Sequence, residues 1–204
     1  MQNFDSLLSR KLTGYQAIQQ PHAQRLRASV SLIFRLAESG AELLLIQRAF
    51  NEKDPWSGQV AFPGGKFEPA DLNSRATAER ETVEEVGIQL LPQDYIGRLD
   101  DVLGPSSSEI KSVHLSCFVY CLRQIVETQH NYEVARVLWV PVSRLNDVRN
   151  IELFQHPQVP GKMMRGISLE ANSPLLLWGL SLKVLWSLFE RLQISADNDY
   201  RIFD

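Results

Sequence analysis

Short apolar runs separated by turn-forming residues dominate the first part of the chain. Residues 28–36 and 42–48 are rich in Leu, Ile, Val and Phe, and Ser39-Gly40 between them is typical of a tight turn. This arrangement predicts a β-hairpin. Further strands are predicted at residues 59–62, 95–102, 113–122 and 134–140.

A helix is predicted over residues 75–86. Ser74 or Asn73 is suited to cap its first turn, and Gly87 stands just beyond its end, where glycine commonly closes a helix. The other predicted segments are a peripheral N-terminal helix within residues 1–26 that ends before Pro21, a short helix at 143–148, a final helix from Pro174 to about Leu192, and a polar tail at 195–204.

The mixture of strands and helices indicates an α/β protein, and its length favours a single domain over residues 1–204. The chain has 204 residues, of which 44% are hydrophobic, enough to bury a core without a disulfide or a structural metal. Cys117 and Cys121 would lie roughly 13 Å apart on one strand, too far for a disulfide. We therefore expect both cysteines in the core.

The formal net charge of −3 argues against a protein that binds nucleic acids or membrane surfaces, because either would require a basic stripe. The most apolar stretch, residues 175–189, is interrupted by polar residues and is too short for a membrane span. The N-terminus lacks the basic start and apolar run of a secretory signal. We expect a cytoplasmic protein.

The predicted helix at 75–86 gathers acidic residues on one face. Glu81, Glu84 and Glu85 have the i, i+3, i+4 spacing that places three carboxylates side by side. Such a face suits a hard divalent cation such as Mg²⁺, and Arg80 can hold the Glu84 carboxylate one turn away. A solvated acidic helix face is the alternative. The opposite face, which can pack on a sheet, carries Ala78, Thr82 and Val86.

Two glycines precede this helix at a short distance, and the combination resembles a known signature. Gly64-Gly65 allows a sharp turn and a close backbone approach. Gly65, Arg80-Glu81, Glu84-Glu85 and Gly87-Ile88 resemble the Nudix box, the signature of the Nudix hydrolases.

The match departs from the family pattern in three ways. Asp71 stands where the family has glutamate, one extra residue separates it from Arg80, and Thr82 occupies an apolar position. Whether Glu68 or Asp71 takes the role of the missing glutamate is open.

The resemblance implies a Nudix-type α/β/α sandwich with a central mixed sheet, spanning residues 28–192. It also implies hydrolysis of a pyrophosphate bond in a nucleoside diphosphate linked to another group, with Mg²⁺ or Mn²⁺ as cofactor. By their match to the box, Glu81, Glu84 and Glu85 are expected as metal ligands, with Gly65 adding a backbone carbonyl. Arg80 is expected to orient a carboxylate.

Within the family, the loop before the box resembles the coenzyme A pyrophosphatases. Gly58-Gln59-Val60-Ala61-Phe62-Pro63-Gly64-Gly65, Thr77-Ala78 and Leu177-Trp178-Gly179-Leu180-Ser181 carry this likeness, whereas residues 48–57 depart from it. Coenzyme A or a derivative is the first candidate substrate. The alternatives are ADP-ribose, another nucleotide sugar or a dinucleotide, and a non-catalytic ligand sensor. The expected partner is a small nucleotide, and a homodimer is left open.

Several residues outside the metal-binding face are candidates for catalysis or substrate binding. The family's general base varies, so the candidates are the box residue Glu84 and the later acidic residues Glu109 and Glu133, each of the latter two with a solvated loop position as the alternative. Candidate substrate contacts are the cations Arg48, Lys66 and Lys111, with a lone surface cation as the alternative, and the aromatic Phe50 and Trp56, with core packing as the alternative. His114 and Trp178 are expected to be structural.

Overall fold

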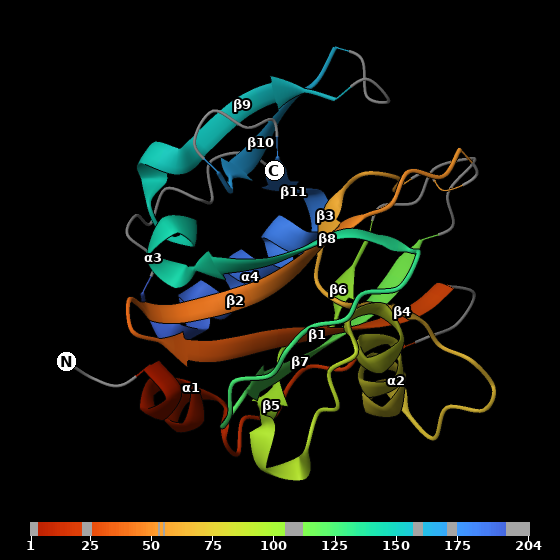
Figure 1. Ribbon diagram of the computed structural model, residues 1–204, viewed down its shortest axis with the longest axis vertical. Coiled ribbons are helices and arrows are strands. Elements are labelled where there is room, and N and C mark those ends of the chain that lie inside the picture. Colours follow the sequence, from red (N-terminus) through yellow and green to blue (C-terminus); the bar gives the residue numbers. More distant parts are fainter. Residues whose placement is uncertain are drawn as a thin grey trace.

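The computed structural model describes residues 4–21, 26–52, 54, 56–104, 112–156, 161–170 and 175–194, and these form an α/β protein with a mixed central sheet (Figure 1). The large sheet has eight strands: β1 (Leu26–Ala37), β2 (Gly40–Arg48), β3 (Val60–Ala61), β4 (Gly64–Lys66), β5 (Tyr95–Arg98), β6 (Val102–Leu103), β7 (Val113–Cys121) and β8 (Val134–Pro141).

The long strand β1 organises this sheet. It pairs with β2 in the predicted hairpin, where Ala37 lies opposite Gly40, and it runs parallel to β7 from Leu26 to Phe34. The sheet order is β3-β2-β1-β7-β5, with β8 on β2, β6 on β7 and β4 on β1. The predicted turn at Gly64-Gly65 is therefore a short strand, paired with residues 28–30 of β1.

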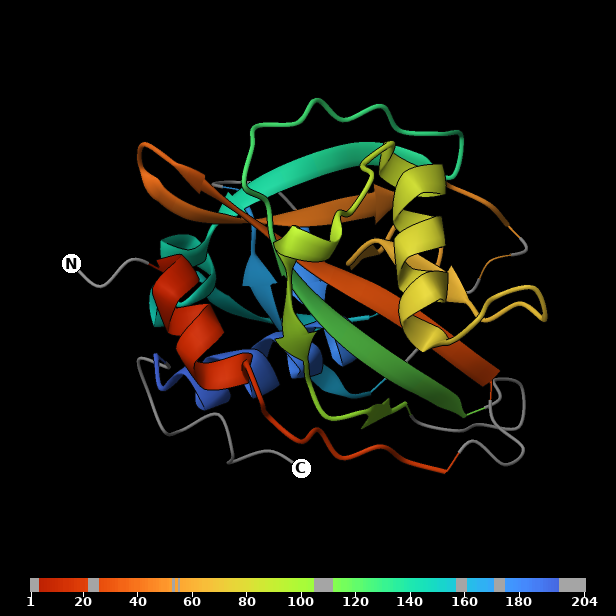
Figure 2. The same ribbon diagram turned by 90° about the horizontal axis from the view of Figure 1, so that it is seen from below.

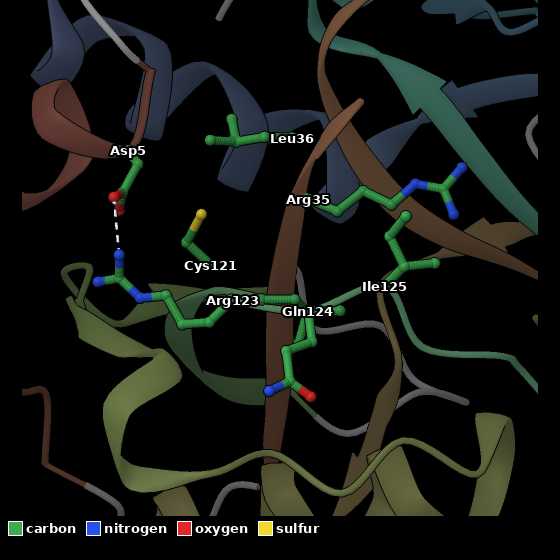
Figure 3. Close-up of a pocket in the computed structure, with 8 residues that line it drawn as sticks. Asp5, Arg35, Leu36, Cys121, Arg123, Gln124 and Ile125 are labelled. Atoms are coloured by element: carbon green, nitrogen blue, oxygen red, sulfur yellow. Dashed lines mark hydrogen bonds and ion pairs between the residues drawn. The ribbon is translucent and has the colours of Figure 1, made fainter. Parts of the chain in front are cut away.

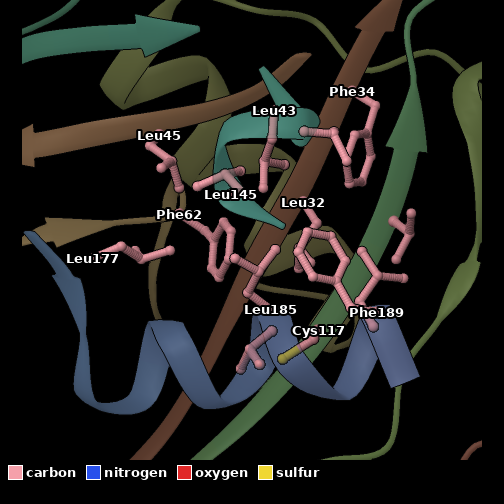
Figure 4. Close-up of a cluster of buried hydrophobic side chains, with 14 of the residues drawn as sticks. Leu32, Phe34, Leu43, Leu45, Phe62, Cys117, Leu145, Leu177, Leu185 and Phe189 are labelled. Carbon is pink, nitrogen blue, oxygen red and sulfur yellow. The ribbon is translucent and has the colours of Figure 1, made fainter. Parts of the chain in front are cut away.

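Both faces of the sheet are covered. Leu43 and Leu45 of β2 belong to one buried cluster and Leu44 and Ile46 to another, as expected from the alternation of side chains along a strand. Helix α2 (Ser74–Val86) packs on the second cluster, while α1 (Phe4–Leu12) and α4 (Gly179–Leu192) cover the first (Figures 2 and 4). Cys117 and Cys121 are free and buried, as predicted.

The boundaries of α2 follow from its predicted caps. The Asn73 side chain accepts hydrogen bonds from the backbone N–H groups of Arg75 and Ala76, at 2.9 and 3.0 Å. Gly87 adopts a left-handed conformation with φ of 72° and donates its N–H to the Val83 carbonyl. These caps fix where the acidic helix begins and ends.

The predicted N-terminal helix is present as α1, and its apolar residues pack more deeply than those of a purely peripheral element. Helix α1 is only nine residues long, and Leu8 and Leu12 are 0% and 1% exposed within the cluster beneath α4. The apolar stripe of the helix packs into the same buried cluster as that of α4, and α1 contacts both α4 and β5. Leu12 also lies close to Gly97 of β5, where a side chain would crowd its backbone.

A second sheet of three antiparallel strands was not predicted. It consists of β9 (Ile151–Gln155), β10 (Met163–Ser168) and β11 (Leu176–Trp178), in the order β11-β10-β9. Because β11 occupies residues expected to be helical, α4 begins at Gly179 rather than at Pro174; Pro174 itself and the tail at 195–204 lie outside the described residues. A short helix α3 (Val142–Leu145) and two 3-10 helices (Pro92–Asp94 and Val148–Asn150) complete the fold.

Within the described part of the chain, no helix combines the length and apolarity needed to cross a membrane.

The burial of α1 predicts that its leucines stabilise the whole domain. Leu8→Ala should lower the free energy of unfolding by about 3 kcal/mol, because it removes buried methyl groups and leaves a cavity. Urea denaturation would measure the change, with Leu72→Ala as the control because Leu72 is 92% exposed. Equal stability of the two variants would contradict the placement of α1 in the core.

Candidate active site

The three glutamates of α2 share one side of the helix, but they differ in their exposure to solvent. The Glu84 side chain is 52% exposed, Glu81 is 14% exposed and Glu85 is only 3% exposed. They form a series from the surface into the junction between α2 and β4. The predicted acidic face therefore exists, but its inner member is buried rather than solvated.

Glu85 is held at the base of this junction by the backbone of β4. Its carboxyl group accepts the N–H of Gly64 at 2.8 Å, and Arg48 Nη1 lies 4.0 Å from its Oε1 atom. Burial is the main cause that raises the pKa of Glu85 to about 8. The hydrogen bond from Gly64 and the charge of Arg48 oppose the shift, and the charges of Glu81 and Glu133 add to it. A cation beside Glu85 would favour its ionised form.

The two glycines of β4 allow α2 to approach this closely. A Cβ atom on Gly65 would overlap the carboxylate of Glu81, and one on Gly64 would overlap the backbone of Ser29 and Val30 in β1. Gly64 also has a φ of +150°, which side-chain-bearing residues rarely adopt. Gly64 is thus needed by the sheet, whereas Gly65 is needed by the acidic side chain above it.

Asp71, and not Glu68, is the acidic partner of Arg80. The Asp71 side chain is 5% exposed and accepts bonds from Arg80 Nε at 2.9 Å and Nη2 at 3.1 Å, and from the Thr77 hydroxyl at 2.9 Å. The Arg80 guanidinium holds the pKa of the Asp71 carboxyl well below its usual range. The Glu68 side chain is exposed, and its backbone N–H donates to Asp71 Oδ2 at 2.9 Å.

Arg80 extends from this buried pair to the acidic face. Its Nη1 atom lies 3.0 Å from Glu84, and its Nη2 atom lies 3.2 Å from Glu81 and 3.1 Å from the Lys66 carbonyl. These contacts connect Glu81 and Glu84 to the buried Asp71 through one guanidinium group. Lys66 is exposed on β4, and the contact that links it to Arg80 is made by its backbone.

Of the two later acidic candidates, the structure brings Glu133 to the site. Its carbonyl accepts the N–H of Ala49 at 2.7 Å, next to Arg48, and its charge acts on both Glu81 and Glu85. The preceding loop is tied to α2 by the N–H of Asn131, which donates to the Glu85 carbonyl at 3.2 Å. Glu109 and Lys111 lie outside the described residues.

Arg48 reaches the site as the partner of an aspartate that the sequence analysis missed. Its Nη2 and Nε atoms bind Asp54 Oδ2 at 2.6 and 3.0 Å, so it is not a lone surface cation. Trp56, two residues beyond Asp54, is half-buried, and its backbone N–H donates to Asp54 Oδ1 at 3.1 Å. Phe50 is 82% exposed, which excludes it from the core. No feature of the loop at 49–74 singles out Asp54 beforehand.

The charges around α2 fit a divalent cation. Each arginine at the site has an aspartate of its own, Asp71 for Arg80 and Asp54 for Arg48. The two arginines therefore offset the charges of Glu81, Glu84, Glu85 and Glu133 only in part. Oxygen ligands of this kind are those that Mg²⁺ and Mn²⁺ prefer. Among the described residues no three acidic, histidine or cysteine side chains already converge as a metal cluster.

The structure places His114 in the core and Trp178 at the wall of a cavity. His114 is 1% exposed and its Nε2 atom lies 3.1 Å from Asp101 Oδ2, in agreement with a structural role. Trp178 is half-buried at the end of β11 and lines a cavity of about 480 Å³, so it is not simply a core residue.

A second cavity of about 290 Å³ lies near α1 and the ends of β1 and β7 (Figure 3). Its lining includes none of the predicted site residues.

The sequence of the chain is similar to those of known proteins. Residues 25–164 match the sequence model of the NUDIX domain. The chain is 30% identical over 124 residues to the mitochondrial coenzyme A diphosphatase NUDT8 of Homo sapiens, covering 61% of this chain and 51% of that protein. It is 31% identical over 133 residues to the peroxisomal coenzyme A diphosphatase NUDT7 of Mus musculus, covering 63% and 50%. The chain thus spans about half the length of these relatives.

A solved structure supports the fold assignment. The NUDIX domain of Shewanella oneidensis NrtR, crystallised with ADP ribose, superposes with a TM-score of 0.55 at 18% identity, covering 94% of this chain and 99% of that one. At this identity the likeness concerns the fold, and it confirms the predicted Nudix-type architecture.

The two glycines predict different consequences of the same substitution. Gly65→Ala should displace the flexible Glu81 side chain while sparing the fold, whereas Gly64→Ala should destabilise the fold because backbone atoms obstruct the methyl group. Melting temperatures with and without Mn²⁺ would separate the effects, because a bound ion stabilises the folded state. We expect Gly65→Ala to lose the Mn²⁺-dependent increase and Gly64→Ala to melt earlier without Mn²⁺. Full Mn²⁺ stabilisation of Gly65→Ala would argue against the site.

The Asp71–Arg80 pair predicts a pH-dependent contribution to stability. Asp71→Asn should lower the free energy of unfolding at pH 7 by about 2 kcal/mol, since it removes a charged acceptor of a buried network. Because the pKa of Asp71 is lowered on folding, this difference should be complete above about pH 4 and shrink as the pH falls further. Urea unfolding at several pH values would measure it. Glu68→Gln is the control, and an equal loss there would assign the role to Glu68.

Proposed function

Because the chain belongs to the Nudix family, we propose that it hydrolyses the diphosphate bond of a nucleoside diphosphate linked to another group, with coenzyme A or a derivative as the leading substrate. The observation that carries the proposal is the set of carboxyl groups on α2 beside Gly64 and Gly65, whose neighbouring arginines are already paired with aspartates. An acidic site of this kind attracts a diphosphate only with cations between the two.

Nudix hydrolases generally use Mg²⁺ or Mn²⁺, and the oxygen donors of α2 suit either ion. We assign Glu81, Glu84 and Glu85 as the side chains that hold the cation, with the carbonyl of Gly65 as a further donor. When bound, the cation supplies neutralisation of the phosphate charge and a lower pKa for the attacking water.

The arginines of the site position these carboxyl groups. Arg80, held by Asp71, restrains Glu81 and Glu84 from one side of the acidic face. Arg48, held by Asp54, approaches Glu85 from the other. Because both guanidinium groups are already anchored, they lose little further conformational entropy when the substrate binds. We assign Arg48, which lies beside Glu85, and Lys66, which is exposed on β4, as candidate contacts for a phosphate of the substrate.

Two acidic residues are our candidates to accept a proton from the attacking water. Glu84 is the exposed member of the α2 series, and Glu133 comes from the loop that is bonded to Ala49 and α2. Within the described part of the chain Glu133 forms no ion pair with an arginine, and its charge already acts on Glu81 and Glu85. We favour Glu133 as the general base, with Glu84 primarily a metal ligand.

The choice of coenzyme A rests on the two curated relatives, which are coenzyme A diphosphatases by name, and on the run Gly58–Gly65 before the box. Their names place them in mitochondria and peroxisomes, so the cytoplasmic location stays a prediction. A ligand sensor is disfavoured because all three carboxylates of the box are present.

A substrate panel tests the activity and its specificity together. The purified chain should cleave coenzyme A in the presence of Mg²⁺ or Mn²⁺ to 3′,5′-ADP and 4′-phosphopantetheine, detected by chromatography. ADP-ribose, NADH and diadenosine polyphosphates complete the panel. Preferred cleavage of one of these would replace coenzyme A as the substrate, and no cleavage of any would overturn the enzymatic proposal.

Variants of α2 separate chemistry from folding. Glu84→Gln should lower kcat at least a hundredfold and keep cooperative melting, because it removes a cation ligand from an exposed position. Glu79→Gln is the matched control, because Glu79 belongs to the same helix but is not assigned to the cation. The Glu79 carboxylate instead binds Arg75 at 3.3 Å and the Tyr120 hydroxyl at 3.2 Å. Equal losses of activity in both variants would contradict the assignment.

A further inference from the structure

The larger cavity lies where the second sheet meets the first. Its lining comes from the end of β2, the loop before β3, from β8, and from β9 and β11, and β11 contacts β3 directly. Its volume of about 480 Å³ is in the range of sites for small organic ligands. None of the acidic residues assigned to the cation belongs to it, so its chemistry is separate from theirs.

One wall of this cavity is aromatic. The rings of His156 and Trp178 lie 4.5 Å apart between their centroids at an interplanar angle of 36°, and Phe154 meets Trp178 edge to face at 5.6 Å. Gly166 of β10 leaves room for the Phe154 ring, which a side chain there would crowd. All three rings are half-buried, so they offer partly accessible faces that suit a planar heteroaromatic group.

The other walls are polar. Gln47 and Arg136 lie opposite each other on β2 and β8, and both line the cavity together with Gln59. Amide groups can donate to and accept from the edge of a base. The Arg136 side chain is 48% exposed and binds Glu170 at 2.5 Å, an ion pair at the surface that an incoming phosphate can replace at little cost.

The cavity adjoins the acidic site through the chain itself. Gln47 lines the cavity and the next residue, Arg48, approaches Glu85. Val60 also lines it, and Gly64, which binds Glu85, is four residues further on, a span of at most about 14 Å. Because neighbouring strand residues point to opposite faces, a ligand that reaches both would pass around the end of β2.

We propose that this cavity binds the nucleoside phosphate half of the substrate, with the base against Trp178 and His156 and a phosphate monoester at Arg136. The statement that the bound nucleotide is part of the substrate rests on the proposed function. The second sheet would then select the nucleotide, while α2 carries out the hydrolysis.

Binding can be tested without turnover. The probe is adenosine 3′,5′-bisphosphate, titrated into the chain without metal and followed by calorimetry, with adenosine 5′-monophosphate as the comparison. Trp178→Leu should weaken the binding of both about tenfold or more. Arg136→Gln should weaken the bisphosphate about tenfold and leave the monophosphate nearly unchanged. Arg123→Gln is the matched control, because Arg123 is 50% exposed, pairs with Asp5 at 2.9 Å, and lines the smaller cavity instead (Figure 3).

Kinetics then connect the cavity to the reaction. In the active chain, Arg136→Gln should raise KM for a substrate with a phosphate monoester on its ribose, with kcat nearly unchanged, and leave KM for the dephosphorylated analogue as it was. If Arg136→Gln loses probe binding but its KM does not change, the cavity does not bind the substrate. It then binds a separate nucleotide. Probe binding that both cavity variants retain would overturn the site altogether.

These outcomes are distinct from those of the proposed function. If the chain binds adenosine 3′,5′-bisphosphate at Trp178 but cleaves nothing in the panel, the hydrolytic proposal fails and the nucleotide site stands. If it cleaves coenzyme A with a KM that neither variant changes, the cavity proposal fails and the hydrolytic one stands.

Discussion

The hydrogen bond from the Gly64 N–H to the buried carboxyl group of Glu85 fixes the position of α2 on the sheet. A carboxyl group that is almost fully buried must be hydrogen-bonded, or its burial would be costly. Its donor belongs to β4, which pairs with β1 through a backbone that tolerates no side chain at this residue. The same contact brings Gly65 beneath Glu81, so the remaining acidic groups are placed by one junction between a helix and a strand.

The balance of charge around this junction explains its chemistry. Arg80 and Arg48 flank the acidic series, yet each is bonded to its own aspartate and neutralises the series only in part. The raised pKa of Glu85 reflects its burial first and the negative charges of Glu81 and Glu133 second. A divalent cation would neutralise this excess of negative charge, and a diphosphate would then bind through it. In the proposed mechanism the arginines would hold the carboxyl groups in place instead of competing with the cation.

The sequence predicted what depends on local rules and missed what depends on distant contacts. The caps of α2 and the common face of its glutamates follow from spacing along one helix, and the β1–β2 hairpin follows from one turn. The depth of Glu85 depends on β4, and the second sheet depends on the pairing of β9, β10 and β11, whose short segments carry little signal alone. The cavity at Trp178 was missed for the same reason, since β2, β8 and β11 meet there only in the folded chain.

Anomalous diffraction at the manganese edge, from crystals of the chain grown with Mn²⁺, tests the central claim most directly. The account predicts a peak among the carboxyl groups of Glu81, Glu84 and Glu85, within coordination distance of the Gly65 carbonyl, and no such peak in crystals of Glu84→Gln grown at the same low Mn²⁺ concentration. Crystals of the wild-type chain that bind Mn²⁺ only at another place, or that leave the face of α2 without a peak, would contradict it.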